Sequence, residues 1–143
     1  MKLLELFDNP VQPTSHESGS YGDTYVFKVG DITYEILIST FGHAVWDVSF
    51  DAQIVPGERV DHATGTGNEV AVFSTVNAVV VKFLQRELHR VRTLSFTADI
   101  DSRAKLYKRL ATRWANQFKM DIAVGKDIID QHEFVLTNPN YRA

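Results

Sequence analysis

The stretch that decides the fold runs from residue 65 to residue 118. It reads GTGNEVAVFSTVNAVVVKFLQREL (65–88), RTLSFTAD (92–99) and SRAKLYKRLATRWANQF (102–118). The apolar, β-branched EVAVF at 69–73 predicts a short strand, and Ser74 or Thr75 after it is a natural helix N-cap. Apolar residues then recur at helical spacing, at Val76, Val79, Val80, Phe83, Leu84 and Leu88. A second strand is expected at 92–98.

A second amphipathic helix is predicted from Asp101 or Ser102 onward. At 100° per residue, one side of this helix carries Leu106, Tyr107, Leu110, Ala111, Trp114 and Phe118. Basic residues lie on or beside the other side, at Lys105, Lys108, Arg109, Arg113 and Lys119. Both helices are therefore expected to pack one face on a sheet.

Strands are also expected on both sides of this stretch. TYVFKV and ITYEILIST (24–40) predict a hairpin around Gly30-Asp31, and VWDVSFD (45–51) alternates apolar and polar residues. Residues 120–125 and 132–137 predict a closing pair. The order predicts an α/β (α+β) protein with a mixed antiparallel and parallel sheet and two main helices.

The first 23 residues predict an N-terminal arm and linker, with a single domain over 24–143. Residues 10–23 are rich in Pro, Ser and Gly, which is typical of a loop. The arm begins with apolar side chains that need a surface to bury them, namely Leu3, Leu4, Leu6 and Phe7. We expect them to contact a protein partner or a second copy of the chain.

Composition excludes several classes of function. The 143 residues contain no cysteine, which excludes disulfides, thiolate catalysis and Cys-ligated zinc. No apolar run is long enough to span a membrane. P-loop, dinucleotide-binding and G-x-S-x-G patterns are absent. Asp61-His62 with Asp47 or Asp51 offers metal-ligand residue types, but no spacing requires a metal, so none is expected.

Charge is unevenly distributed along the chain. The net charge is −3, yet residues 82–119 carry +7 and residues 1–81 carry −8. This asymmetry favours an anion or nucleic-acid binder through the 82–119 face, or simply solvated helix faces. Aromatic residues do not interleave with the basic run, so nucleic acid is the less favoured partner.

The order of elements resembles the GNAT-type N-acetyltransferases. In that family an antiparallel meander leads to a strand–helix–strand–helix unit and a final hairpin. Residues 104–110 (AKLYKRL) are similar to the late-helix pattern A-x-L-Y-x-x-L of the family. The resemblance implies acetyl-CoA as cofactor and Tyr107 as the general acid for the departing thiolate. Core packing is the alternative role for Tyr107.

The chain departs from that family where the cofactor phosphates bind. The family has Q/R-x-x-G-x-G/A after its fourth strand, because the backbone must approach the pyrophosphate closely. With a strand at 69–73, the matching residues 73–77 (FSTVN) contain no glycine, and Gly65 and Gly67 precede the strand. Ile100 stands where the family has Asn before the last helix. On this reading no cofactor is expected.

A second resemblance covers most of the chain. The segments TGTG (64–67), VFSTV (72–76), FTAD (96–99) and SRAKLYKRL (102–110) are similar to a group of small tailed-bacteriophage proteins, often with an N-terminal piece like LLELFDNP. The resemblance implies a phage accessory or virion-associated protein, in the cytoplasm of the infected host cell or in the virion.

Candidate ligand-binding residues are small polar residues beside the predicted first helix and one arginine. They are Thr64, Gly65, Thr66, Gly67, Ser74, Thr75 and Arg103. The alternatives are an ordinary turn for 64–67 and an ion pair of Arg103 with Asp99 or Asp101. The primary interpretation is a non-catalytic interaction module. A divergent acyl-CoA-dependent N-acetyltransferase using Tyr107 and an anion or nucleic-acid binder are the alternatives.

Overall fold

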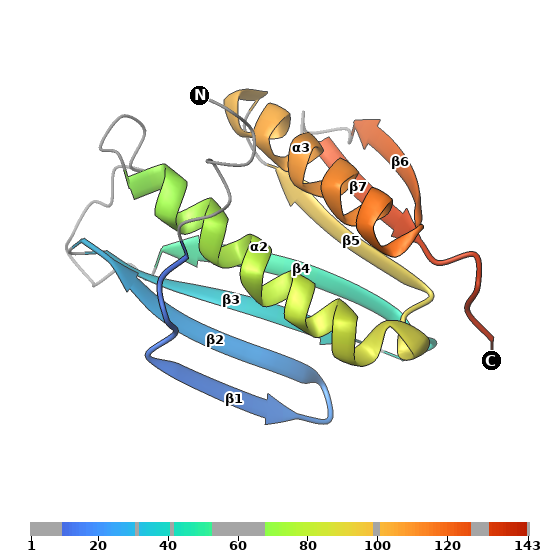
Figure 1. The fold of residues 1–143 in the computed structure, drawn as a ribbon, viewed down its shortest axis with the longest axis horizontal. Coiled ribbons are helices and arrows are strands. Elements are labelled where there is room, and N and C mark those ends of the chain that lie inside the picture. The colour runs from blue at the N-terminus through green and yellow to red at the C-terminus, as the bar shows by residue number, and fades with distance from the viewer. Residues whose placement is uncertain are drawn as a thin grey trace. The chain divides into compact units, whose positions relative to one another are not determined.

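The computed structural model describes residues 10–30, 32–40, 42–52, 68–98, 101–126 and 132–142. The strands are β1 (Ser15–Gly19), β2 (Gly22–Val29), β3 (Ile32–Thr40), β4 (Val45–Ala52), β5 (Thr93–Ala98), β6 (Asp121–Lys126) and β7 (His132–Thr137) (Figure 1). The helices are α2 (Asn68–Glu87), the short 3-10 helix η1 (Leu88–Arg90) and α3 (Asp101–Phe118). The apolar arm residues Leu3, Leu4, Leu6 and Phe7 lie outside the described residues.

Hydrogen bonds link the strands in the order β1-β2-β3-β4-β5-β7-β6. The pairs β1–β2, β5–β7 and β6–β7 are antiparallel, and β4–β5 is parallel. The parallel pair needs a crossover, and α2 supplies it between β4 and β5. The prediction of an α+β protein with a mixed sheet and two main helices is confirmed.

The start of the first helix corrects the sequence analysis. The prediction of a strand at 69–73 is wrong, because α2 begins at Asn68 and runs through this segment without interruption. Ser74 and Thr75 therefore lie inside the helix and do not cap it. The apolar spacing continues backward from Val76 to Phe73 and Val72, so helical periodicity and burial prevail over the local strand preference of β-branched residues.

Part of the predicted linker is also a strand. Ser15–Gly19 forms β1 and pairs with β2 in register, from Ser15 opposite Val26 to Gly19 opposite Gly22. All five residues of β1 are exposed, so the segment lacks the alternation of apolar and polar residues that reveals a half-buried strand. Backbone pairing with β2 keeps this segment in the extended conformation.

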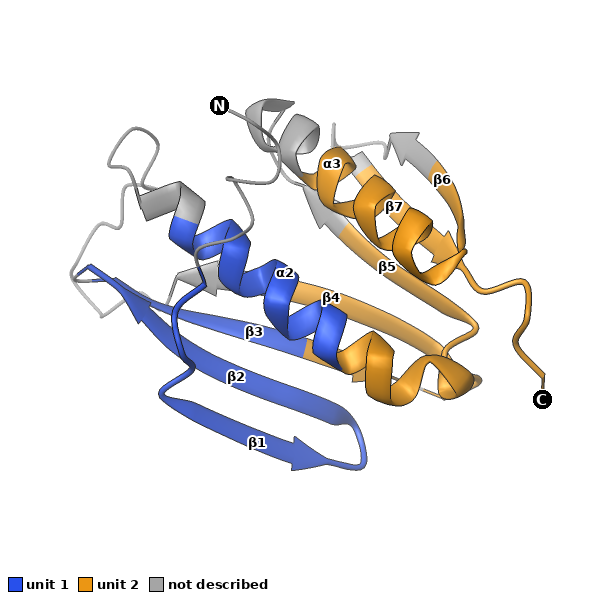
Figure 2. Ribbon diagram, viewed as in Figure 1, with its two compact units in different colours: residues 1–37, 50–82 blue, residues 38–49, 83–143 orange. Residues whose placement is uncertain are grey.

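Two compact units divide the chain (Figure 2). Unit 1 comprises residues 1–37 and 50–82, and unit 2 comprises 38–49 and 83–143. In unit 1, Phe27 of β2 stacks on Tyr34 of β3, with ring centroids 5.3 Å apart. Phe73 of α2 packs edge-on against Phe50 of β4 at 5.9 Å. Helix α2 is buried without a break from Val72 to Asn77 in this unit.

An aromatic cluster centred on Phe96 of β5 forms the core of unit 2. Its ring lies 5.7 Å from Tyr107, 5.4 Å from Trp114 and 5.2 Å from Phe134. Helix α3 packs on β5, β6 and β7, and Figure 1 shows it lying along β5 and β7. Of the predicted apolar stripe of α3, Tyr107, Leu110, Ala111 and Trp114 are buried and Phe118 is half-buried, while the side chain of Leu106 lies outside the described residues.

Neither helix, over the residues described, is long and apolar enough to cross a membrane.

Candidate functional site

The parallel ladder between β4 and β5 is short. Its paired positions are Val45 with Thr93, Trp46 with Leu94 and Asp47 with Ser95. Beyond Asp47 and Ser95 both strands continue, to Ala52 and Ala98, but the described residues form no further pair between them. Asp47 therefore lies at the last paired position of the ladder, where backbone hydrogen bonding between the two strands ends.

Alternation along the strands decides which way Asp47 faces. Trp46 and Val48 are buried, so Asp47 between them points to the opposite face of β4. In β5, Leu94 and Phe96 are buried in the same way, and Ser95 faces away from the aromatic core. The parallel register places Asp47 and Ser95 next to each other on this second face.

The Asp47 carboxyl group is partly buried and hydrogen-bonded. The Ser95 hydroxyl lies 3.2 Å from Asp47 Oδ1 and 3.5 Å from the Trp46 carbonyl oxygen. Burial raises the pKa of Asp47, and the negative charge of Glu133 adds to the increase, while the hydrogen bond from Ser95 opposes it. A carboxylate with a raised pKa is a stronger base than an ordinary aspartate, which suits it to accept a proton.

The predicted ligand segment of Thr64, Gly65, Thr66 and Gly67 lies outside the described residues. Its position in the chain is nevertheless informative, because the next residue, Asn68, is the first residue of α2. The two glycines thus precede a helix N-terminus and not a strand. The prediction that Gly65 and Gly67 precede a strand at 69–73 is therefore wrong.

Ser74 and Thr75 are buried within α2 at 0% and 1% exposure. The Thr75 hydroxyl donates a hydrogen bond to the Ala71 carbonyl oxygen at 2.7 Å and accepts one from the Val11 N–H at 3.0 Å. These bonds connect the helix to the segment that precedes β1. Thr75 therefore has a structural role. The side chains of Ser74 and Thr75 are both buried.

Tyr107 is 4% exposed and packs against Phe96. This placement fits the core role that the sequence left open, and the role of general acid stays a prediction. The side chain of Arg103 lies outside the described residues.

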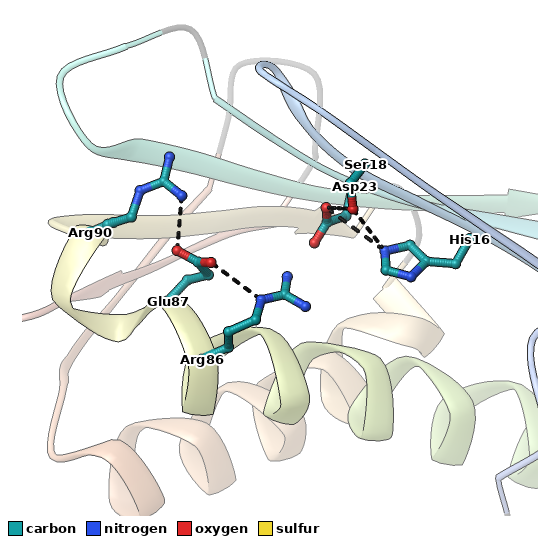
Figure 3. A network of polar contacts seen from close by, with 6 residues as sticks. All are labelled: His16, Ser18, Asp23, Arg86, Glu87 and Arg90. Atoms are coloured by element: carbon teal, nitrogen blue, oxygen red, sulfur yellow. Dashed lines mark hydrogen bonds and ion pairs between the residues drawn. The ribbon is translucent and has the colours of Figure 1, made fainter.

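A serine, a histidine and an aspartate meet on the β1–β2 hairpin, as Figure 3 shows. Ser18 Oγ donates to Asp23 Oδ1 at 2.8 Å, and His16 Nε2 lies 3.2 Å from the same serine oxygen. The serine hydroxyl thus donates its hydrogen bond to the carboxylate and not to the imidazole. This arrangement differs from a nucleophilic triad, in which histidine removes the serine proton. The group ties the two strands together.

Sequence reasoning considered Asp47 only as a metal ligand beside Asp61 and His62. Over the described residues, no three acidic or histidine side chains converge to hold a metal ion. Alternation does predict that Asp47 faces away from Trp46. Ser95, which donates a hydrogen bond to Asp47, is 48 residues away in the chain. It becomes a neighbour of Asp47 only through the parallel register of β4 and β5.

No protein-family model matches the chain, and comparison with curated proteins and with solved structures also gave no match.

Proposed function

We propose that this protein binds acyl-CoA through the glycine-rich segment 64–67 that precedes α2 in the chain and transfers the acyl group to an amine. The observation that carries the proposal is the start of α2 at Asn68, directly after Thr64-Gly65-Thr66-Gly67. The glycine-rich segment then stands between a strand, β4, and a helix. That is the position in which the acetyltransferase resemblance requires it.

The residue types of this segment and the helix N-terminus that follows it fit a pyrophosphate. The first N–H groups of a helix have no partner within the helix, and the helix dipole favours an anion there. Glycine has no Cβ, so phosphate oxygens can approach the backbone closely at Gly65 and Gly67. The spacing His62-x-x-Gly65-x-Gly67 is similar to the family pattern Q/R-x-x-G-x-G/A, with histidine at the first position.

The order of the other elements supports the same proposal. A run of neighbouring strands from β1 to β4 leads to β4–α2–β5–α3, and β6 and β7 form the closing hairpin. The fourth strand of the resemblance is β4, and not the segment 69–73. With this correction the missing glycines at 73–77 no longer argue against a cofactor, while Ile100 still stands where the family has Asn.

Asp47 is the residue that we assign to proton transfer. Bound CoA supplies an acyl thioester, and an amine attacks that thioester only in its neutral form. Within unit 2, Asp47 is suited to accept the proton that an amine loses, because its raised pKa makes it a stronger base. The hydrogen bond from Ser95 fixes Oδ1 and so orients the carboxylate. Tyr107 remains the candidate proton donor for the thiolate that leaves.

Calorimetric titration with acetyl-CoA tests the proposal. We expect micromolar affinity, which corresponds to about −8 kcal/mol. Gly67→Val blocks approach to the backbone and should weaken binding about tenfold or more, as expected for a lost charge-assisted hydrogen bond. Gln117→Val, at an exposed position of α3, is the control. Absence of binding at millimolar acetyl-CoA, or equal affinity in a folded Gly67→Val variant, contradicts the proposal.

The resemblance to tailed-phage proteins suggests where such an activity acts. It supports a phage accessory or virion-associated protein in an infected cell or in the virion. Contact of Leu3, Leu4, Leu6 and Phe7 with a protein partner or a second copy remains the alternative, non-catalytic function. It predicts that deleting residues 1–9 reduces association without changing affinity for acetyl-CoA.

A further inference from the structure

A hollow of about 390 Å³ opens within unit 2, where β3 turns into β4 and where α2 ends. Its lining includes Gly42, Trp46, His89, Arg90, Tyr141 and Arg142. Two arginines, a histidine and two aromatic residues are therefore gathered around one concave surface. The volume lies within the range of small-molecule sites, roughly 300–1,000 Å³.

Hydrogen bonds fix the backbone that carries His89 and Arg90. The Trp46 indole N–H donates to the Arg90 carbonyl oxygen at 3.2 Å. The side-chain amide of Asn138, which is buried, donates to the carbonyl oxygens of Leu88 and Val91 at 3.2 and 3.1 Å. His89 and Arg90 thus lie on η1, whose backbone is fixed by hydrogen bonds to the carbonyl oxygens of Leu88, Arg90 and Val91.

The arginines leave positive charge available at the hollow. Arg90 forms an ion pair with Glu87, with Nη1 and Oε2 2.9 Å apart, as Figure 3 shows. Its guanidinium also lies 5.7 Å from the centre of the Trp46 ring. Arg142 donates to the Tyr141 carbonyl oxygen at 3.1 Å, and no carboxylate of the described residues pairs with it.

The turn between β3 and β4 forms another part of the lining. His43 and Ala44 have φ angles of 59° and 61°, which are unusual for residues with a side chain. A two-residue hairpin turn favours positive φ at both of its central residues, and the Val45 N–H closes the turn by donating to the Gly42 carbonyl oxygen at 3.2 Å. A Cβ built at Gly42 meets no atom within 4 Å, so the backbone there faces open space.

We propose that this hollow binds an organic phosphate of about mononucleotide size. The planar fork of arginine matches the oxygens of a phosphate, and Arg142 is available to pair with it. The hollow is too large for a phosphate ion alone, and Tyr141 supplies an aromatic wall for the rest of the ligand, whereas Trp46 is 4% exposed and contributes little surface. None of the lining residues belongs to segment 64–67 or is Asp47 or Ser95, so the inference does not depend on the proposed function.

Titration of the full chain with AMP, adenosine and inorganic phosphate tests this proposal. AMP should bind, and both adenosine and inorganic phosphate should bind more weakly. Arg142→Ala should weaken AMP binding about tenfold or more, the expected effect of one lost charge-assisted hydrogen bond. Arg109→Ala, which removes an exposed arginine of α3 outside the hollow, should leave the affinity unchanged.

A further variant separates this site from the acyl-CoA site. Gly67→Val should bind AMP as the unmodified protein does. The proposal is overturned if AMP does not bind at millimolar concentration, or if Arg142→Ala binds it equally well. It is also overturned if adenosine or inorganic phosphate binds as tightly as AMP, or if Gly67→Val abolishes AMP binding.

Discussion

Asp47 shows how much of the chemistry depends on one residue. It is the last paired residue of β4, it accepts a hydrogen bond from Ser95, and burial raises its pKa above the ordinary value of 3.8. These features make it the proton acceptor of the proposed reaction. None of them follows from its neighbours in the sequence.

Replacing Asp47 by Asn keeps the size and the hydrogen-bond acceptor but removes the base. We expect turnover to fall by about 10²- to 10⁴-fold, the typical contribution of a general base, with little change in affinity for acetyl-CoA. In the unmodified protein, the base acts only when ionised. Turnover should therefore fall as the pH is lowered through the raised pKa of Asp47. Initial rates of thiol release against pH measure both effects, and an active Asp47→Asn variant excludes this role.

At the scale of elements, α2 shows where sequence reasoning succeeds and where it fails. The stripe from Val76 to Leu88 predicted the helix. The structure buries its apolar positions up to Leu84, whereas Leu88 is half-buried and lies in η1. The predicted start was wrong because Ser74 and Thr75 are good caps in isolation. Burial in a folded unit, which the sequence does not state, lets the helix continue back to Asn68.

Hairpins were predicted where turns carry a clear signal. Gly30, with φ of 61°, permits the turn between β2 and β3, as the Gly30-Asp31 pair indicated. The strand β1 was not predicted, because none of its five residues is buried and its sequence shows no apolar alternation. The candidate site was predicted only in part. Residue types made segment 64–67 a candidate ligand segment, which stays a prediction, but the Asp47–Ser95 pair arises from a long-range register that no local pattern encodes.

The hydrogen bond from the Val11 N–H to the Thr75 hydroxyl is expected to stabilise the packing of α2. Thr75→Val removes the acceptor of a partly buried N–H and should lower the free energy of unfolding by about 1–3 kcal/mol. Thr112→Val is a matched control, because its hydroxyl makes the same kind of bond to the Lys108 carbonyl oxygen but is exposed. Urea unfolding measures both variants. Equal losses in the two would show that the Val11 contact is not important.

At the scale of the whole molecule, each compact unit has its own aromatic packing. In unit 2, Trp114 is 1% exposed and its ring contacts Phe96. Trp114→Ala should therefore lower the free energy of unfolding by about 3–5 kcal/mol, through lost burial and the cavity left behind. The exposed Gln117→Ala on the same helix should change it by less than about 0.5 kcal/mol. A small loss for Trp114→Ala in a urea melt would contradict the assigned packing of α3.

The central claim is that segment 64–67, directly before α2 in the chain, holds the phosphates of CoA, and backbone amide NMR tests it most directly. On titration with CoA, the N–H resonances of Gly65, Gly67 and Asn68 should shift most, because these groups would donate to the pyrophosphate. The N–H resonance of Thr112 on α3 should not move. Saturation with CoA that leaves residues 64–70 unshifted, or that shifts only the His89 and Arg90 resonances, would contradict the account.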